Sequence, residues 1–195
     1  LISLTCGKKL LYKPRSCAID LAFNKLIAVL NSDIERCDLK LIEMMDMGDY
    51  SWVDFIEHKP CNTISELHEY YYNGGVLLAA LFLLNGTDIH FENIIANGKH
   101  PVIVDLECLF DTTLGKNFDV FNTGLLPIPS NSVDYSGLGA GGKQRALNKV
   151  WKWKELGTDA LSLEKMEGFF HPETNHPVFN SKKIEPKEYV SDIVE

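Results

Sequence analysis

The sequence predicts an α+β fold in two parts, a strand-rich part over residues 1–62 and a part over residues 63–195 that begins with a long helix. At 195 residues, with 45% hydrophobic and 24% charged residues, the chain is globular and can bury a sizeable core. Two short apolar runs, residues 94–96 and 101–104, flank a glycine-containing turn. This pattern is typical of a buried hairpin of two antiparallel strands.

The first part is expected to contain strands around one helix. Residues 7–13 predict a turn into a strand, and Pro14 ends the strand because proline has no N–H to donate to a ladder. A helix is expected from residue 16 or 17 to about residue 30, where apolar residues recur with a helical period. Residues 33–47 are apolar at many positions and fit a helix or a strand; we expect a strand over Leu39–Glu43.

The second part opens with a helix signature at Ser65, which should continue to about Leu84. Gly74 and Gly75 interrupt this helix at a cost of about 1 kcal/mol each relative to alanine, so they mark either a break or a close approach of another segment. Residues 110–134 have little periodicity and are expected to form an activation-like loop that crosses the front of the site. The glycine-rich residues 136–142 lack the lysine and serine of a phosphate loop and predict a flexible hinge.

The most informative motif is Asp88-Ile89-His90-Phe91-Glu92-Asn93, which is followed twelve residues after the asparagine by Asp105-Leu106-Glu107. Phosphoryl transfer needs one carboxylate to receive the proton of the attacking hydroxyl, a task that suits Asp88. It also needs magnesium clamped against the phosphates, and Asn93 and Asp105 are hard oxygen ligands of the kind that magnesium prefers. Two paired strands would carry these ligands side by side, which is the layout of a phosphotransferase centre.

In protein kinases, this loop has the sequence H-R-D-x-x-x-x-N and is followed by the motif D-F-G. Here the histidine comes after the aspartate, an order that resembles lipid kinases of the phosphoinositide type. The predicted fold is therefore protein/lipid kinase-like and bilobal, with an incomplete N-lobe in residues 1–62 and the C-lobe core in residues 63–195. The alternative is that the acids are unrelated loop residues at the ends of a buried hairpin.

Further segments narrow the family. Together with the two motifs above, and over about Leu10 to Asp159, the chain resembles the dehydration domain of class II lanthipeptide synthetases, the LanM type. The additional segments that carry this resemblance are Tyr12-Lys13-Pro14-Arg15-Ser16, Trp52-Val53-Asp54-Phe55-Ile56 and Glu69-Tyr70-Tyr71.

The resemblance implies a two-step reaction on a precursor peptide that carries a leader and a core rich in Ser, Thr and Cys. Such enzymes use ATP and Mg²⁺ to phosphorylate Ser or Thr, and then eliminate phosphate to leave dehydroalanine or dehydrobutyrine. A zinc-dependent cyclase domain, expected outside this chain, later adds Cys thiols to these alkenes.

Carried onto this sequence, the resemblance assigns Lys13 to the nucleotide phosphates. The acid that pairs with Lys13 stays open among Asp20, Glu35 and Glu43. The kinase-like centre would consist of Asp88, His90, Asn93, Asp105 and Glu107, although Glu107 could equally be a solvent-facing residue at a strand end.

Elimination needs a base at Cα and cationic or hydroxyl groups that stabilise the departing phosphate. The resemblance points to Lys152 and Thr158, in a position where such enzymes carry a basic residue and a threonine. An arginine is expected where Lys152 stands, and lysine cannot bind phosphate in the bidentate manner of arginine. The surrounding basic cluster could also be a solvated helix face; its members are Lys143, Arg145, Lys149, Lys152 and Lys154.

Two other functions remain open from the sequence. A lipid or small-molecule phosphotransferase would share Lys13, Asp88, Asn93 and Asp105 but would have no use for Lys152. A catalytically inactive fragment that binds peptide is the other alternative, because the upstream phosphate-facing loop of the family is expected before Leu1.

Composition excludes some classes. The formal net charge is 19 minus 27, or −8, which disfavours a nucleic-acid partner because such a partner needs a broad basic surface. The five cysteines are spread along the chain with no C-x-x-C pair, and we expect reduced thiols in a cytoplasmic protein. The longest apolar run, Val76 to Leu84, has nine residues and is too short to cross a bilayer core of roughly 30 Å.

Overall fold

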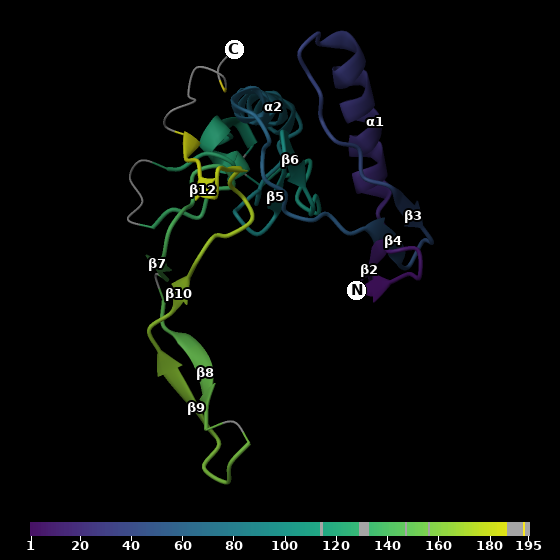
Figure 1. Ribbon diagram of the computed structural model, residues 1–195. Helices are drawn as coiled ribbons and strands as arrows, with labels where there is room; N and C mark the ends of the chain where they lie inside the picture. The colour runs from purple at the N-terminus through teal and green to yellow at the C-terminus, as the bar shows by residue number, and fades with distance from the viewer. Residues whose placement is uncertain (114, 129–132, 147, 156, 187–192, 194–195) are drawn as a thin grey trace.

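The computed structural model of the chain describes residues 1–113, 115–128, 133–146, 148–155, 157–186 and 193. The first part holds one antiparallel sheet of four strands in the order β1-β2-β4-β3, with the helix α1 beside it (Figure 1). Its elements are β1 (Ile2–Ser3), β2 (Lys9–Lys13), α1 (Ala18–Asp33), β3 (Met44–Asp46) and β4 (Ser51–Asp54). The expected strand before Pro14 and the expected helix are both confirmed, and the helix continues three residues beyond the predicted end.

The expected strand over Leu39–Glu43 is wrong, because residues 37–43 are irregular and β3 begins at Met44. Two asparagines of α1 occupy the backbone groups that a ladder would have used. The amide of Asn31 donates to the carbonyl of Leu39 at 2.8 Å and accepts its N–H at 2.8 Å, and Asn24 makes the same pair of bonds to Ile42 at 2.7 and 3.4 Å. Side-chain amides thus satisfy this buried backbone in place of a neighbouring strand.

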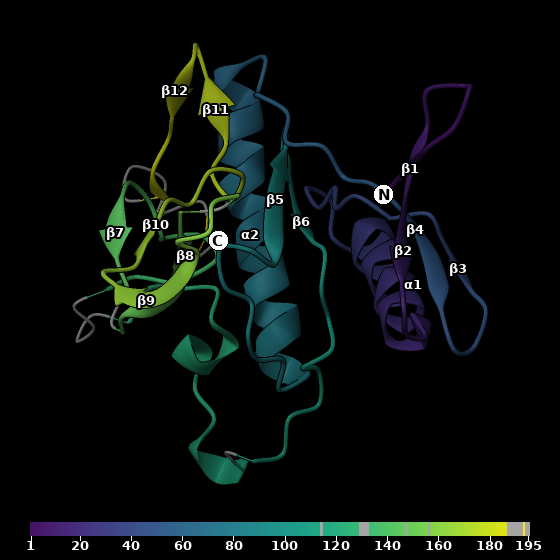
Figure 2. The same ribbon diagram turned by 90° about the horizontal axis from the view of Figure 1, so that it is seen from below.

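The second part is built on α2 (Ile64–Leu83), with the hairpin β5 (Ile94–Asn97) and β6 (His100–Ile103) packed beside it (Figure 2). Thr63 caps this helix, since its side chain accepts the N–H of Glu66, and the helix begins at Ile64, one residue before the expected Ser65. It runs unbroken through both glycines. A Cβ at Gly74 would lie 3.1 Å from a methyl of Leu138, so this glycine permits a close approach.

The core lies between α2, the β5–β6 hairpin and the later loops, with α1 contributing Phe23 and Ile27. The residues 136–142 take part in this core, so the expected flexible hinge is wrong. Leu138 and Ala140 are fully buried, and Asn175 donates hydrogen bonds of 2.9 and 2.8 Å to the carbonyls of Gly137 and Ala140. These contacts fix the glycine-rich segment against the body of the molecule.

The remaining elements are short. They are the 3-10 helices η1 (Gly115–Asn117) and η2 (Val120–Thr123) and the strands β7 (Gln144–Arg145), β8 (Val150–Lys154), β9 (Ser162–Met166), β10 (Phe169–Phe170), β11 (Val178–Phe179) and β12 (Lys182–Lys183). The β8–β9 hairpin projects away from the rest of the chain, with the β7–β10 pair at its base (Figure 1).

The described residues form a mixed α/β structure with two α-helices and several small sheets. The segment between β4, which ends at Asp54, and α2, which begins at Ile64, connects the first part to the second (Figure 1). The division into two domains near residue 62 stays a prediction. No helix in the described ranges is long and apolar enough to span a membrane. The kinase-like bilobal arrangement stays a prediction.

Candidate functional site

The backbone of the loop 87–91 is held by three neighbouring segments. The N–H groups of Thr87, Ile89 and Phe91 donate to the carbonyls of Cys108, Thr123 and Tyr135 at 2.9, 2.9 and 3.0 Å. Alternate residues of the loop are therefore anchored, and Ile89 is buried in the core. The side chains of Asp88 and His90, which lie between the anchored positions, are 60% and 29% exposed and lie where a substrate can reach them.

Asp88 has a positive φ of 64°, a conformation that few residues other than glycine adopt. The amide nitrogen of Asn93 donates to the carbonyl of Asp88 at 2.8 Å and stabilises this backbone. His90 Nε2 lies 3.7 Å from Asp88 Oδ1. Strained backbone of this kind often occurs at functional sites, and here it sets the direction of the predicted catalytic carboxylate.

The β5–β6 hairpin brings Asn93 and Asp105 to the same end. Ile94 pairs with Ile103, and the N–H of Val104 donates to the carbonyl of Asn93 at 2.9 Å. Because the amide nitrogen of Asn93 is bonded to the carbonyl of Asp88, its oxygen is the atom that this side chain can offer to a cation. The expected pairing of the two strands is confirmed, and the role of Asn93 and Asp105 as metal ligands stays a prediction.

The donor set fits magnesium bound together with a phosphate. Within the described ranges, no three His, Cys, Asp or Glu side chains are grouped so that they could hold a metal by themselves. Magnesium in nucleotide sites commonly uses one or two protein oxygens and completes its shell with phosphates and water. Asp105, whose side chain is 39% exposed, and the Asn93 oxygen match that requirement.

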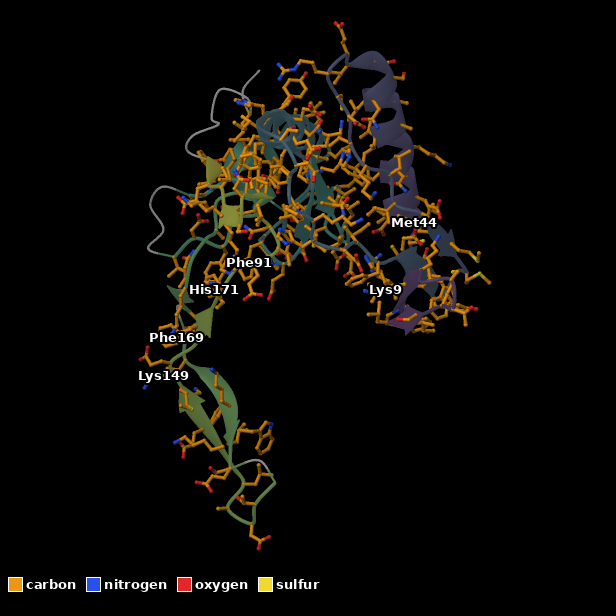
Figure 3. The ribbon with its side chains drawn as sticks, viewed as in Figure 1. Lys9, Met44, Phe91, Lys149, Phe169 and His171 are labelled. Carbon is orange, nitrogen blue, oxygen red and sulfur yellow. The ribbon has the colours of Figure 1, made fainter. Side chains whose placement is uncertain are left out.

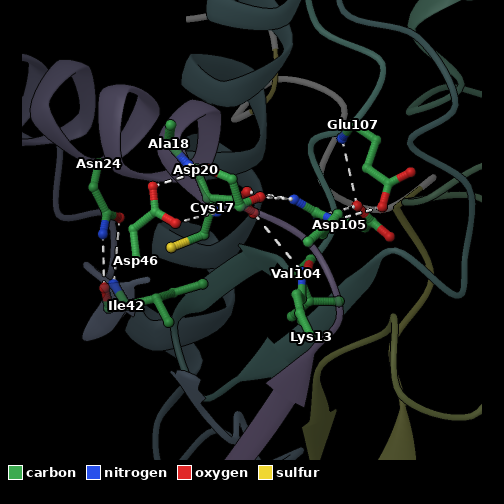
Figure 4. Close-up of polar contacts among 12 residues, drawn as sticks. Lys13, Cys17, Ala18, Asp20, Asn24, Ile42, Asp46, Val104, Asp105 and Glu107 are labelled. Carbon is green, nitrogen blue, oxygen red and sulfur yellow. Dashed lines mark hydrogen bonds and ion pairs between the residues drawn. The ribbon is translucent and has the colours of Figure 1, made fainter. Parts of the chain in front are cut away.

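Lys13, at the end of β2, reaches the same hairpin end from the first part of the chain. Its ammonium donates to the carbonyl of Val104 at 2.7 Å and lies 3.8 Å from Asp20 Oδ1 on α1 (Figure 4). The structure thus selects Asp20 among the acids that could pair with Lys13, and Glu43 instead pairs with Lys8 at 2.7 Å. Both Lys13 and Asp20 are largely buried, so the cation is held in a defined place.

Arg15 is a site residue to which the sequence analysis assigned no role, although it belongs to the Lys-Pro-Arg-Ser motif. Its guanidinium contacts Asp20 Oδ2 at 3.0 Å, Asp105 Oδ1 at 2.8 Å and Glu107 Oε1 at 2.5 Å. Burial lowers the pKa of Arg15, but the hydrogen bond to Asp20 and the nearby charges outweigh it, and the pKa lies above its ordinary value. Glu107 is exposed, yet it is paired within the site.

Two cavities are lined in part by residues of this candidate site. One encloses about 90 Å³ and is lined mostly by apolar residues together with Lys13 and Asp20. Met44 lines this cavity, whereas Met45 and Met47 are exposed. The second cavity encloses about 120 Å³ beside Asp88 and His90, and its far wall comes from the described residues of the loop 121–136.

The structure does not bring Lys152 and Thr158 to this centre. Lys152 lies on β8 opposite Glu164, and the hydroxyl of Thr158 donates to the carbonyl of Glu155 at 2.9 Å in the loop at the hairpin tip. Because Lys152 and Lys154 lie on a strand, the alternative of a solvated helix face is wrong for them. The hairpin extends away from the body (Figure 1).

The base of the hairpin nevertheless lies against the loop 87–91. The ring of Phe170 stacks on Phe91 at 5.0 Å and on Tyr135 at 4.6 Å between ring centroids. Figure 3 shows Phe91 near the base of the projecting segment and Lys149 further along it. Stacked rings connect the hairpin directly to the residue that follows His90.

Comparison with known proteins gives two findings. Residues 1–195 match the family described as "Domain of unknown function (DUF4135)". The chain is also 30% identical, over 226 aligned residues, to the lacticin 481/lactococcin biosynthesis protein LcnDR2 of Lactococcus lactis subsp. lactis. The alignment covers 99% of this chain and 24% of that protein, so the chain spans about a quarter of the length of this relative.

Proposed function

The chain belongs to the DUF4135 family and to the class II lanthipeptide synthetases, and from this premise we propose that it carries the kinase-like centre of a peptide dehydratase. The proposed reaction is ATP- and Mg²⁺-dependent phosphorylation of Ser or Thr in a precursor peptide, followed by elimination of phosphate. The observation that carries the proposal is the convergence of the buried Lys13–Asp20 pair on the hairpin end that holds Asn93 and Asp105.

Lys13 would hold the nucleotide phosphates, and Asn93 and Asp105 would hold the metal. When bound, magnesium ATP supplies the phosphoryl group that is transferred. The cavity beside Lys13 suits the base of a nucleotide, since its lining is mostly apolar and also includes Lys13, with Asp20 and Asp54 as its acidic residues. We propose on these grounds that the first part corresponds to a kinase N-lobe and the second part to a kinase C-lobe.

The second cavity, which is lined in part by Asp88 and His90, would receive the peptide hydroxyl. Asp88 would accept the proton of a Ser or Thr hydroxyl as its oxygen bonds to phosphorus. His90 lies close enough to Asp88 to orient its carboxylate. The opposite wall from the loop 121–136 would exclude water from the acceptor, which is the role expected of an activation-like loop.

In the elimination, a base would take the proton from Cα, the electron pair of the C–H bond would form the Cα–Cβ double bond, and phosphate would leave with the electron pair of the broken Cβ–O bond. Lys152 and Thr158 would stabilise the departing phosphate through an ammonium and a hydroxyl. Since both lie on the projecting hairpin, elimination requires the phosphorylated peptide and the hairpin to meet. The stacked rings at the hairpin base would couple such a movement to the catalytic loop.

The proposed partner is a precursor peptide with a leader and a core rich in Ser, Thr and Cys. A zinc cyclase domain elsewhere in the same protein would consume the alkenes, and we propose that the reaction takes place in the cytoplasm.

The test is mass spectrometry of a Ser/Thr-rich precursor peptide co-expressed with the full-length protein. Asp88→Asn should abolish both phosphate addition and water loss, whereas Thr158→Ala should let phosphopeptide accumulate. Asp33→Asn serves as a control, because it makes the same chemical change at the exposed last turn of α1 and should leave dehydration unchanged.

Normal dehydration by the Asp88 variant would rule out the assignment. A phosphorylated lipid or sugar with no water loss from peptide would favour a small-molecule phosphotransferase instead. Nucleotide binding without turnover would favour an inactive peptide-binding protein.

A further inference from the structure

We propose that Arg15 is a counter-cation bonded to the carboxylates of the proposed metal site, and that its bond to Asp105 must break when a divalent ion binds there. This inference rests on the proposed function, because it takes Asp105 as a metal ligand. Arg15 is then a positioning residue: the metal ion binds well only when it arrives together with a phosphate group.

The geometry of the guanidinium is the first support. Each of its three nitrogens contacts a different carboxylate: NH1 contacts Asp20, NH2 contacts Asp105 and Nε contacts Glu107. Three carboxylates around one cation would repel one another without it, since they bring three negative charges into a partly buried space. The planar guanidinium of arginine has donors on three sides and can bond to all three carboxylates at once, whereas the compact ammonium of lysine cannot.

The contacts divide into two groups. NH1 also donates to the carbonyl of Ser16 at 3.0 Å, so this nitrogen is held inside the first part by Asp20 and the backbone. The bonds from NH2 and Nε cross to Asp105 and Glu107, in the segment that follows β6. The guanidinium can therefore leave Asp105 and Glu107 and still remain bonded to Asp20.

A divalent ion competes directly with these crossing bonds. Magnesium binds carboxylate oxygen at about 2.0–2.1 Å, and the oxygen of Asp105 that Arg15 contacts is one of the two that the ion can use. The positive charges of the ion and of Arg15 also repel each other at this range. A metal ion that binds alone therefore separates Arg15 from Asp105 and leaves the guanidinium without that partner. A metal ion that brings phosphate supplies new negative charge for Arg15 and Lys13.

The test is binding of Mn²⁺ alone, as a probe for the divalent ion, to the full-length protein in the absence of nucleotide. Calorimetry and the loss of the free Mn²⁺ spin-resonance signal both report this binding without any catalytic turnover. Arg15→Gln should bind Mn²⁺ at Asp105 about tenfold more tightly than the unmodified protein, since a competing unit charge is gone. Arg15→Lys should give a smaller gain, because one ammonium still competes.

Matched variants isolate the site. Lys9→Gln removes the same charge from an exposed pair with Glu57 and should change Mn²⁺ affinity less than about twofold. Adding Asp105→Asn to Arg15→Gln should remove the gained affinity, which would locate the metal at this carboxylate. Circular dichroism and thermal unfolding check that each variant is folded, and Arg15→Lys keeps the test open if Arg15→Gln does not fold.

Unchanged or weaker Mn²⁺ binding in folded Arg15→Gln and Arg15→Lys would overturn the inference. That result, together with normal dehydration of the precursor peptide, would leave the proposed function standing. Tighter Mn²⁺ binding in a protein that modifies no peptide would support the role of Arg15 and reject the dehydratase proposal.

Discussion

Replacing Asp20 by asparagine tests whether one buried carboxylate organises the cations of the site. Asparagine has nearly the same shape, so the change removes the charge and leaves the packing of α1 in place. The Asp20 side chain is 7% exposed and lies 3.0 Å from Arg15 and 3.8 Å from Lys13. Both cations would lose their shared partner inside a region with little water.

The magnitude follows from these contacts. A hydrogen bond to a charged group contributes about 1.5–3 kcal/mol, and breaking a buried ion pair by removing one partner costs about 3–5 kcal/mol. Arg15 keeps its contacts with Asp105 and Glu107, and asparagine still offers one oxygen, which places the expected loss near the lower end of that range. We expect Asp20→Asn to lower the free energy of unfolding by about 3 kcal/mol, equivalent to roughly 6–12 °C in Tm for a domain of this size.

The assay is urea unfolding of the full-length protein, followed by circular dichroism, with nucleotide binding measured in parallel. The denaturant midpoint should fall at an unchanged slope, and nucleotide affinity should fall because Lys13 is no longer held. Asp33→Asn is the control: it makes the same chemical change at the exposed last turn of the same helix and should alter stability by less than about 0.5 kcal/mol. If both variants unfold like the unmodified protein, the reasoning about the buried pair is refuted.

Three further predictions follow from other parts of the structure. Phe170→Leu removes a stacked ring that connects the hairpin to Phe91 in the loop 87–91, so with the proposed dehydratase activity phosphopeptide should accumulate in co-expression, whereas a wild-type product ratio would argue against coupling. At pH 8, iodoacetamide should label exposed Cys6 well before Cys61, because burial raises the pKa of the Cys61 thiol to about 11; equal labelling in a peptide map would contradict this. Burial lowers the pKa of His176 below its ordinary 6.5, so unfolded chains take up the proton first and the free energy of unfolding should decline as pH falls below about 6.5. His176→Gln should flatten that decline in urea titrations, and an unchanged slope would exclude His176 as its source.

Much of the fold could be predicted because its signals are local. Pro14 ends β2 because it has no N–H to donate to the neighbouring strand. The helical period of the apolar residues places α1 and α2 within a few residues of their observed bounds. The hairpin that carries Asn93 and Asp105 follows from two apolar runs around Gly98, which has the positive φ that the turn needs. The residue types of the candidate site could also be identified from the sequence, since the proposed phosphoryl transfer would require them at this spacing.

The failures share a different cause. Leu39–Glu43 has a strand-like composition, but Asn24 and Asn31 take up its backbone hydrogen bonds from a helix that precedes it in the chain. The glycine-rich segment suggested a hinge, yet Asn175 holds it from more than thirty residues away. In both cases, a side chain distant in sequence satisfies the backbone, and no local pattern reports such a bond.

The sequence alone determined which functional groups are present for the proposed phosphoryl transfer and on which elements they lie, because residue type and local periodicity depend only on the order of the amino acids. Only the tertiary structure decided that Asp20 is the partner of Lys13 and that Arg15 joins Asp20, Asp105 and Glu107. It also separated Lys152 and Thr158 from the loop 87–91 by placing them on a projecting hairpin (Figure 1). Ion pairs depend on distances of a few ångströms between residues that are up to 92 positions apart in the chain, and those distances exist only once the chain has folded.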